Sequence, residues 1–250
     1  MATFVPKIII LLMLGQLLSA CTMPVHQAVL DGEGSAVLPD NSVYHGHFEN
    51  GKFDGKGRLD WKDGDKYIGN FKEGLFSGYG EYYSRLGDVY KGEHKLGLWD
   101  GKGEYREKDG TIYRGDYKNG LANGHGTLTR PGMGVYTGEF KDGLYDGQGE
   151  MRFEGGGFYK GGFSNGMWEG QGHLVHHSGE DYQGEFHRGE RHGHGKIVWR
   201  NGDSYEGGFV RDEPNGVGSC LLEGKAGMCR FVRGELEIFI PKSDTNQQLL

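Results

Sequence analysis

Short runs of alternating apolar and polar residues recur along the chain, and turn signals that contain glycine separate them. Residues 113–117 alternate (Tyr-Arg-Gly-Asp-Tyr), Asn119 and Gly120 follow, and a second alternating run extends from Gly124 to Leu128. Alternation with a period of two is typical of a β-strand, and Asn-Gly between two such runs indicates a tight turn. The pattern therefore predicts a β-hairpin in this segment.

This hairpin is one copy of a repeat that is 23 residues long. A tyrosine begins each copy, and we number the positions of a copy from this tyrosine as zero. Glycine occupies positions 2, 11 and 13 of all eight copies. Position 7 is glycine and position 4 is aromatic in seven copies each, with Asp212 and His94 as the exceptions. The eight repeat tyrosines are Tyr44, Tyr67, Tyr90, Tyr113, Tyr136, Tyr159, Tyr182 and Tyr205.

The repeat predicts how the hairpins pack. Side chains at positions 0, 2 and 4 share one face of the first strand, and those at positions 11, 13 and 15 share one face of the second. We interpret all of these glycines as gaps over which neighbouring rings lie. A second turn signal, such as Asp63 and Gly64, leads to the next hairpin. Because one hairpin cannot bury its own rings, we expect the hairpins to stack.

Composition narrows the class of protein. The chain of 250 residues has 49 Gly, only six Pro, and 14 Tyr, 13 Phe and 4 Trp, which excludes collagen and argues against a disordered linker. Its formal net charge is −7, whereas proteins that bind nucleic acid usually carry an excess of Lys and Arg. We therefore expect no nucleic-acid partner.

The consensus Tyr-x-Gly-x-Phe-x-x-Gly-x-x-x-Gly-x-Gly-x-Leu resembles the MORN (membrane occupation and recognition nexus) repeat. The resemblance implies an all-β fold, an elongated single-layer antiparallel sheet or solenoid of sixteen strands in stacked β-hairpins. Eight copies cover residues 44–226. A degenerate ninth copy with a capping strand is expected at residues 227–241, followed by a polar tail at 242–250.

The amino-terminal sequence is typical of a targeting signal. Residues 1–20 contain one charge, Lys7, and an apolar run, so they are typical of a signal peptide. Leu18, Ser19, Ala20 and Cys21 resemble the lipobox of bacterial lipoproteins, which implies cleavage before Cys21 and its acylation. By the same resemblance, Thr22 favours the outer membrane of the bacterial envelope. An ordinary signal peptide and an uncleaved anchor remain open, and residues 21–43 are interpreted as a flexible tether.

Motifs that suggest chemistry fit the repeat better than a catalytic site. Ser164 lies in a Gly-x-Ser-x-Gly match, but a nucleophile elbow needs a following helix and none is predicted. His192 and His194 have the spacing of two metal ligands and are only a weak metal candidate, since position 10 is commonly polar in this chain. We therefore expect no enzyme activity and no cofactor.

Two cysteines lie near the carboxyl terminus of the repeats. Cys220 stands at the apolar position 15 of the last copy, and Cys229 falls on the expected next strand. Adjacent strands bring β-carbons close to disulfide range, so a Cys220–Cys229 disulfide is predicted, with a buried thiol pair as the alternative.

The sequence favours a non-enzymatic envelope scaffold for protein–protein interaction. Membrane-lipid association is an alternative that the family resemblance implies, and glycan or peptidoglycan binding through an aromatic ladder is another. This ladder occupies position 9, and Ala122 interrupts it. It either forms an exposed strip for a partner or folds inward as a second small core. Its members are Phe53, Phe76, Trp99, Tyr145 and Trp168.

Overall fold

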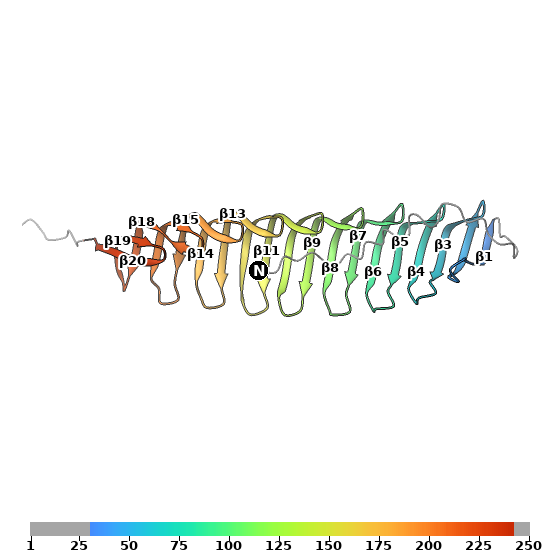
Figure 1. The fold of residues 1–250 in the computed structure, drawn as a ribbon, viewed down its shortest axis with the longest axis horizontal. Coiled ribbons are helices and arrows are strands. Elements are labelled where there is room, and N and C mark those ends of the chain that lie inside the picture. Colours follow the sequence, from blue (N-terminus) through green and yellow to red (C-terminus); the bar gives the residue numbers. More distant parts are fainter. Residues whose placement is uncertain (1–30, 243–250) are drawn as a thin grey trace, which may run out of the picture. The chain divides into compact units, whose positions relative to one another are not determined.

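The computed structural model describes residues 31–242, and all the regular secondary structure in this range is β. The chain divides into two compact units. Figure 1 shows that each consists of strands that follow one another in chain order. The amino-terminal unit comprises described residues 31–131 and 139–144, and the carboxyl-terminal unit comprises residues 132–138 and 145–242. The strand β10 (Gly134–Lys141) contributes residues to both.

In the amino-terminal unit, each strand pairs antiparallel with the next in chain order. The hairpin predicted around Asn119 and Gly120 is confirmed, and both residues have the positive φ values of a type I′ turn, 50° and 84°. The strands are β1 (Gly32–Val37), β2 (Val43–Glu49), β3 (Lys52–Asp60), β4 (Lys66–Lys72), β5 (Leu75–Tyr83), β6 (Val89–Lys95), β7 (Leu98–Arg106), β8 (Ile112–Lys118) and β9 (Leu121–Arg130).

The carboxyl-terminal unit continues the same pattern of antiparallel hairpins. A short strand and a longer one both pair with β16 in the last full copy, and the expected capping strand is present as β20. The strands are β11 (Leu144–Phe153), β12 (Gly157–Ser164), β13 (Met167–His176), β14 (Asp181–His187), β15 (Glu190–Val198), β16 (Ser204–Val210), β17 (Glu213–Pro214), β18 (Gly216–Leu222), β19 (Lys225–Val232) and β20 (Glu235–Pro241).

One boundary expected from the sequence is wrong. Residues 32–37 fall within the expected flexible tether, but they form β1, which pairs antiparallel with β2 from Gly32 opposite Phe48 to Val37 opposite Val43. Gly34 lies directly opposite Gly46, which is position 2 of the first copy. Gly34 therefore extends the row of facing glycines onto β1. The first repeat therefore has a strand on both sides.

The repeat tyrosines form the core of each unit. Tyr90 is fully buried, and its hydroxyl donates a hydrogen bond of 2.9 Å to the carbonyl oxygen of Glu93. The ring lies over the backbone of Gly92 and Gly103, where an added β-carbon at Gly103 would be 2.6 Å from the hydroxyl oxygen. The ring-over-glycine interpretation is therefore confirmed for positions 2 and 13. Burial raises the pKa of the repeat tyrosine Tyr44 to about 12.

The glycine at position 11 is required for a different reason. Its interpretation as a gap beneath a ring is wrong. Gly124 has φ +100°, and a β-carbon there would meet the side chain of Asp116 rather than a tyrosine. The register between β8 and β9 shifts here, because one residue separates Gly115 from Tyr117 while three separate Ala122 from Gly126. Position 11 is glycine because it lies in this β-bulge with a left-handed backbone.

Hydrogen bonds between copies couple neighbouring hairpins. The amide of Gly74 at position 7 donates to the carbonyl of Phe53 in the preceding copy (2.8 Å), and Gly97 donates to Phe76 (3.0 Å). The carboxylate of Asp54 at position 10 accepts from the backbone N–H of Glu73 (3.2 Å), and this bond with the Lys72 ammonium lowers the pKa of Asp54. Position 10 thus caps the turn of the next copy.

Candidate functional site: a glycine-floored groove

The open face of the carboxyl-terminal unit, opposite the tyrosine rings, carries a continuous row of exposed backbone. Six glycines stand directly opposite one another on six consecutive strands. Their side-chain positions point toward the tyrosines, so only their backbone faces outward. Side chains on either side rise above this floor and form two walls. The glycines are Gly149, Gly161, Gly172, Gly184, Gly195 and Gly207.

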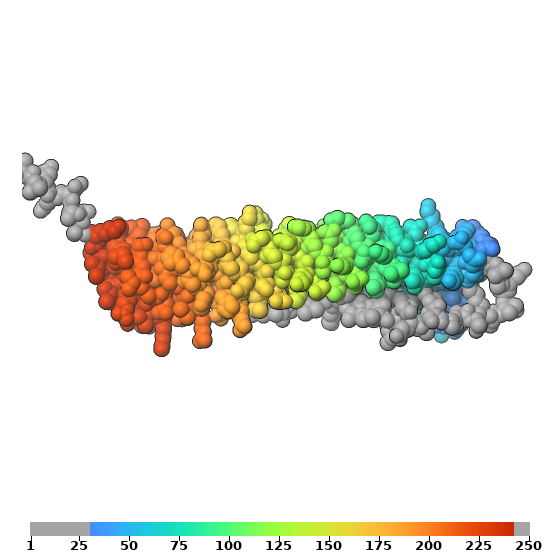
Figure 2. All heavy atoms as spheres, turned by 90° about the horizontal axis from the view of Figure 1, so that it is seen from above, coloured from blue at the N-terminus to red at the C-terminus, as the bar shows by residue number. Residues whose placement is uncertain are grey.

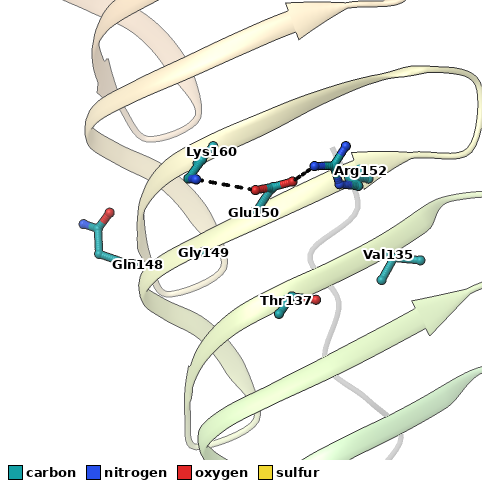
Figure 3. A pocket seen from close by; sticks show the side chains of 7 residues that line it. All are labelled: Val135, Thr137, Gln148, Gly149, Glu150, Arg152 and Lys160. Atoms are coloured by element: carbon teal, nitrogen blue, oxygen red, sulfur yellow. Dashed lines mark ion pairs between the residues drawn. The ribbon is translucent and has the colours of Figure 1, made fainter.

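The first wall is a ladder in which each member lies opposite the next on the neighbouring strand. Its members are Glu150, Lys160, His173, Gln183, Lys196 and Glu206. Gln148, Gln171, Glu185 and His194 line the second wall. The groove between the walls has a volume of about 740 Å³, and an adjoining hollow of about 480 Å³ shares Gln148 and Lys160 with it (Figure 3). We call this feature the carboxyl-terminal groove.

Ion pairs neutralise one end of the groove. Glu150 pairs with Arg152 on its own strand and with Lys160 at 3.7 Å on the next strand (Figure 3). Farther along, Glu185 accepts a hydrogen bond of 3.0 Å from the backbone N–H of His194. Lys196 makes no ion pair with any residue between 31 and 242. The middle of the first wall therefore presents an ammonium group and the Gln183 amide to solvent.

The amino-terminal unit has the same glycine row but a more neutralised wall. Lys91 pairs with Glu81 at 2.9 Å, and Glu104 pairs with both Arg106 and Arg114. These pairs join wall residues to one another and leave fewer charged groups for a partner. The carboxyl-terminal groove is thus the better candidate for recognition. The repeat pattern in the sequence does not reveal it, because open-face residues differ from copy to copy.

The aromatic ladder of position 9 lies on the tyrosine side of the sheet. Each ring stacks on the tyrosine of its own copy, and Phe53 and Phe76 are 5% and 8% exposed. This geometry agrees with the alternative in which the position-9 rings fold inward as part of a core. Phe53 and Phe76 cannot form an exposed strip for a partner. Trp99, Tyr145 and Trp168 are half-buried. The stacked pairs, with their centroid separations, are Tyr44–Phe53 (3.8 Å), Tyr67–Phe76 (3.9 Å), Tyr90–Trp99 (4.1 Å), Tyr136–Tyr145 (3.9 Å) and Tyr159–Trp168 (4.4 Å).

Three copies lack the stacked ring and have Ala122, Arg191 and Pro214 at position 9. A cavity of about 30 Å³ lies beside Ala122, Tyr113 and Phe140. Arg191 places its guanidinium 5.7 Å from the centroid of Tyr182 and pairs with Asp212 at 3.4 Å. The position thus accepts a flat cation as well as a ring.

His94 occupies the aromatic position 4 of the third copy and is 4% exposed. Its ring lies edge-on to Tyr67 and Tyr90, both at 5.2 Å between centroids, and its Nδ1 lies 3.1 Å from the carbonyl oxygen of Gly92. Nε2 is buried without a hydrogen-bond partner. Desolvation lowers the pKa of His94 to about 4, so the imidazole is neutral at pH 7.

The remaining sequence candidates have separate locations. His194 belongs to the second wall, whereas His192 lies opposite Glu185 with its ring 5.8 Å from that of His187. Over residues 31–242, no three His, Cys, Asp or Glu side chains gather as metal ligands would. Cys21 and the signal-peptide motif lie outside the described residues. The same range contains no helix with the length and hydropathy to cross a bilayer.

The structure carries a disulfide between Cys220 and Cys229, whose Cα atoms are 6.1 Å apart. Both side chains are buried, at 6% and 2% exposure. The register places Cys220 opposite Gly227 and Cys229 opposite Gly218, so the two cysteines are diagonal neighbours on β18 and β19. The bridge joins the last full copy to the degenerate ninth copy.

Comparison with protein-family models identifies the repeat. The model described as "MORN repeat" matches residues 44–66, 67–89, 113–132, 136–158, 159–180, 182–204 and 205–222. The chain belongs to the MORN repeat family. The third MORN copy, residues 90–112, is not among the matched segments, although β6 and β7 form the same hairpin with the same tyrosine hydrogen bond. This copy carries His94 where the other copies have an aromatic residue.

Two solved structures illustrate a distant similarity to this MORN chain. The TCP10 domain of Danio rerio CPAP, in complex with a peptide of Danio rerio STIL, is 12% identical with a TM-score of 0.49, covering 87% of this chain and 99% of that one. The SAS-4 TCP domain of Drosophila melanogaster, in complex with a Proline Rich Motif of Ana2, is 10% identical with a TM-score of 0.30, covering 84% and 97%. No curated protein matches the sequence.

Proposed function

We propose that this MORN protein is a non-enzymatic scaffold of the bacterial envelope that docks an extended polypeptide segment in the carboxyl-terminal groove. The observation that carries the proposal is the pair of polar walls on either side of a backbone floor. Gln171 and Gln183 supply both donors and acceptors there, as recognition of a polypeptide backbone requires. The walls come from several copies, so one segment contacts many hairpins.

The spacing of the strands fits an extended segment that crosses them. Neighbouring strands are about 4.8 Å apart, so one MORN copy advances about 9.6 Å along the groove. An extended chain advances about 3.3 Å per residue, and three residues span about the same distance. Every third side chain of the segment would therefore meet equivalent wall positions in successive copies.

The charge of the walls favours a protein over a polyanion. Lys160 and Lys196 alternate with Glu150 and Glu206, so the groove has no continuous positive strip. Nucleic acid and anionic lipid headgroups are bound by clustered Lys and Arg, which this face lacks. A segment of mixed polar and charged residues can satisfy both signs.

We further propose that Cys21 is acylated and holds the chain at the outer membrane. The support is the sequence around Cys21, because two or more acyl chains anchor a protein stably where one does not. The test is fractionation of Cys21→Ala beside the parent chain. Release of the variant from the membrane supports the anchor. An equally firm association, with no amino-terminal acylated cysteine in mass spectra, overturns it.

Photo-crosslinking in intact cells tests the docking proposal. A benzophenone amino acid replaces Gln183 in the groove, and in a matched control it replaces Glu190, which is exposed at the start of β15 and does not line the groove. A protein adduct from position 183 alone supports the proposal. No adduct from position 183, or the same adduct from both positions, overturns it.

A further inference from the structure

The last three strands of the carboxyl-terminal unit expose an unusual concentration of aliphatic side chains. The first wall of the groove continues from Glu206 to Ser219, to Met228 and then to Ile240, each opposite the next. Val217, Arg230 and Ile238 form a parallel row. The open face thus changes from polar to apolar at β18–β20. The atoms of these strands lie in the red part of Figure 2.

The exposed areas of these side chains are large. Val217 is 64% exposed, Met228 44%, Ile238 46% and Ile240 63%. Isolated surface aliphatics are common, but contiguous ones on adjacent strands mark an interaction surface. This group is contiguous because the register places its members side by side.

The outer edge of β20 is also unpaired within the described residues, where β20 pairs only with β19. An edge strand offers free N–H and C=O groups to another chain, and natural edges are blunted by charge, proline or a short length. On the open face, β20 carries Ile238 and Ile240 without a charge between them, and Pro241 stands only at the end of the strand. This edge is therefore suited to strand addition.

The sequence of β20 is complementary to itself in one antiparallel register. With a twofold axis at Phe239, Ile238 of one copy faces Ile240 of the other, and both lie on the open face. In the same register Glu237, which pairs with Arg230 at 3.4 Å, faces Pro241 of the second copy, whereas parallel in-register pairing would set Glu237 beside Glu237. An axis at Ile238 would instead oppose Ile240 to Leu236, which lies on the other face because the register shifts between Arg230 and Phe231.

We propose that β20 is a self-association site, where a second copy of this chain adds its own β20 antiparallel about Phe239. Backbone hydrogen bonds across the two edges supply the attraction. The cross-strand pairs of Ile238 and Ile240 add to it, because aliphatic pairs directly opposite one another stabilise a sheet. The interface is isologous, as twofold symmetry requires.

Mass measurement of the full chain in mild detergent gives the first test. We expect a dimer whose fraction rises with protein concentration. Ile240→Lys should return the chain to a monomer without loss of folding, because this side chain is mostly exposed. The matched control is Val210→Lys, an exposed aliphatic on β16 that should leave the dimer unchanged. A monomeric parent chain, or a dimer that survives Ile240→Lys, overturns the proposal.

Cysteine crosslinking tests the register. Two tagged versions of the full chain are co-expressed, one with Ile238→Cys and the other with Ile240→Cys. Directly opposite residues have β-carbons about 5 Å apart and diagonal ones about 7 Å apart, so a disulfide between opposite residues should form faster. We expect the mixed disulfide dimer to form faster than a disulfide dimer of either variant alone. Equal linkage of single variants, or a ladder of higher multiples from head-to-tail pairing, overturns the proposal.

Discussion

The hydroxyl oxygen of Tyr136 lies 2.5 Å from the point where a β-carbon at Gly149 would stand. Two ring carbons of the same tyrosine are 2.6 and 2.7 Å from this point. The tyrosine is fully buried, so its ring has no free direction in which to move. Each MORN copy repeats this close approach of ring to backbone, and it links the spacing of Tyr and Gly in the sequence to the packing of the sheet.

Gly149→Ala is expected to destabilise the protein by about 1 to 3 kcal/mol, the usual cost of inserting a methyl group into a filled core. The measurement is the free energy of unfolding in urea. Gly155→Ala is the matched control, because a β-carbon at Gly155 meets nothing within 4 Å. Equal effects of the two substitutions would contradict the role assigned to Tyr136.

The sequence predicted the hairpins because ring and glycine periodicities both follow from side-chain sterics. It could not predict which carbonyl oxygen accepts the hydrogen bond from the Tyr90 hydroxyl, since every residue has a backbone carbonyl whatever its side chain. The strand β1 was missed for a similar reason. Its Gly-Glu-Gly-Ser-Ala-Val sequence has no strong strand propensity, and it pairs with β2 only because β2 offers a free edge.

Phe76→Ala should cost about 3 to 5 kcal/mol of unfolding free energy, the range for removing a buried ring. The ring stacks on Tyr67 at 3.9 Å between centroids and touches Trp61 edge-on at 6.1 Å. Leu96→Ala is the control, because Leu96 is 74% exposed and should change stability by less than about 0.5 kcal/mol. A small effect of Phe76→Ala, measured by urea unfolding, would argue that position 9 is not core.

His94 is expected to make stability depend on pH. The pKa of His94 is lowered to about 4 in the folded chain, against 6.5 for the unperturbed group. The unfolded chain therefore takes up a proton between these values while the folded chain does not. Stability should be fully present above pH 6.5 and fall by about 3 kcal/mol as the pH drops to 4.

The control for this prediction is His94→Phe, which places the usual aromatic residue at position 4. Exposed histidines and carboxylates titrate in both chains, so the difference between the two stability curves isolates His94. We expect the difference to change with pH below 6.5 and to be flat above it. A constant difference from pH 4 to 8 would show that the buried imidazole is not the source.

The Cys220–Cys229 bond is expected in protein exported to an oxidising compartment. Alkylation of the denatured chain without reductant should leave both residues unlabelled, and reductant should expose both. Because the closed loop is short, with a sequence separation of nine, the bond should contribute about 2 to 3 kcal/mol. Quantitative labelling of either cysteine before reduction would contradict the bond.

The candidate site was less predictable than the fold. The position-9 rings stood out in the sequence because aromatics are conspicuous, yet Phe53 stacks inside the unit. The groove depends instead on residues such as Gln183 and Lys196, which differ between copies and become neighbours only through the register of β14 and β15. Such a wall can be predicted only when the pairing of the strands is known.

The most direct test of the docking account is the crosslinking yield from position 183 when Lys196 is changed to Glu. Lys196 lies opposite Gln183 in the same wall, and loss of a hydrogen bond to a charged group weakens binding by about tenfold or more. The account predicts that Lys196→Glu lowers the yield of the protein adduct by about this factor, while Lys225→Glu, an exposed lysine outside the groove, leaves it unchanged. An unchanged yield with Lys196→Glu, or an equal loss with Lys225→Glu, would contradict the carboxyl-terminal groove as the docking site.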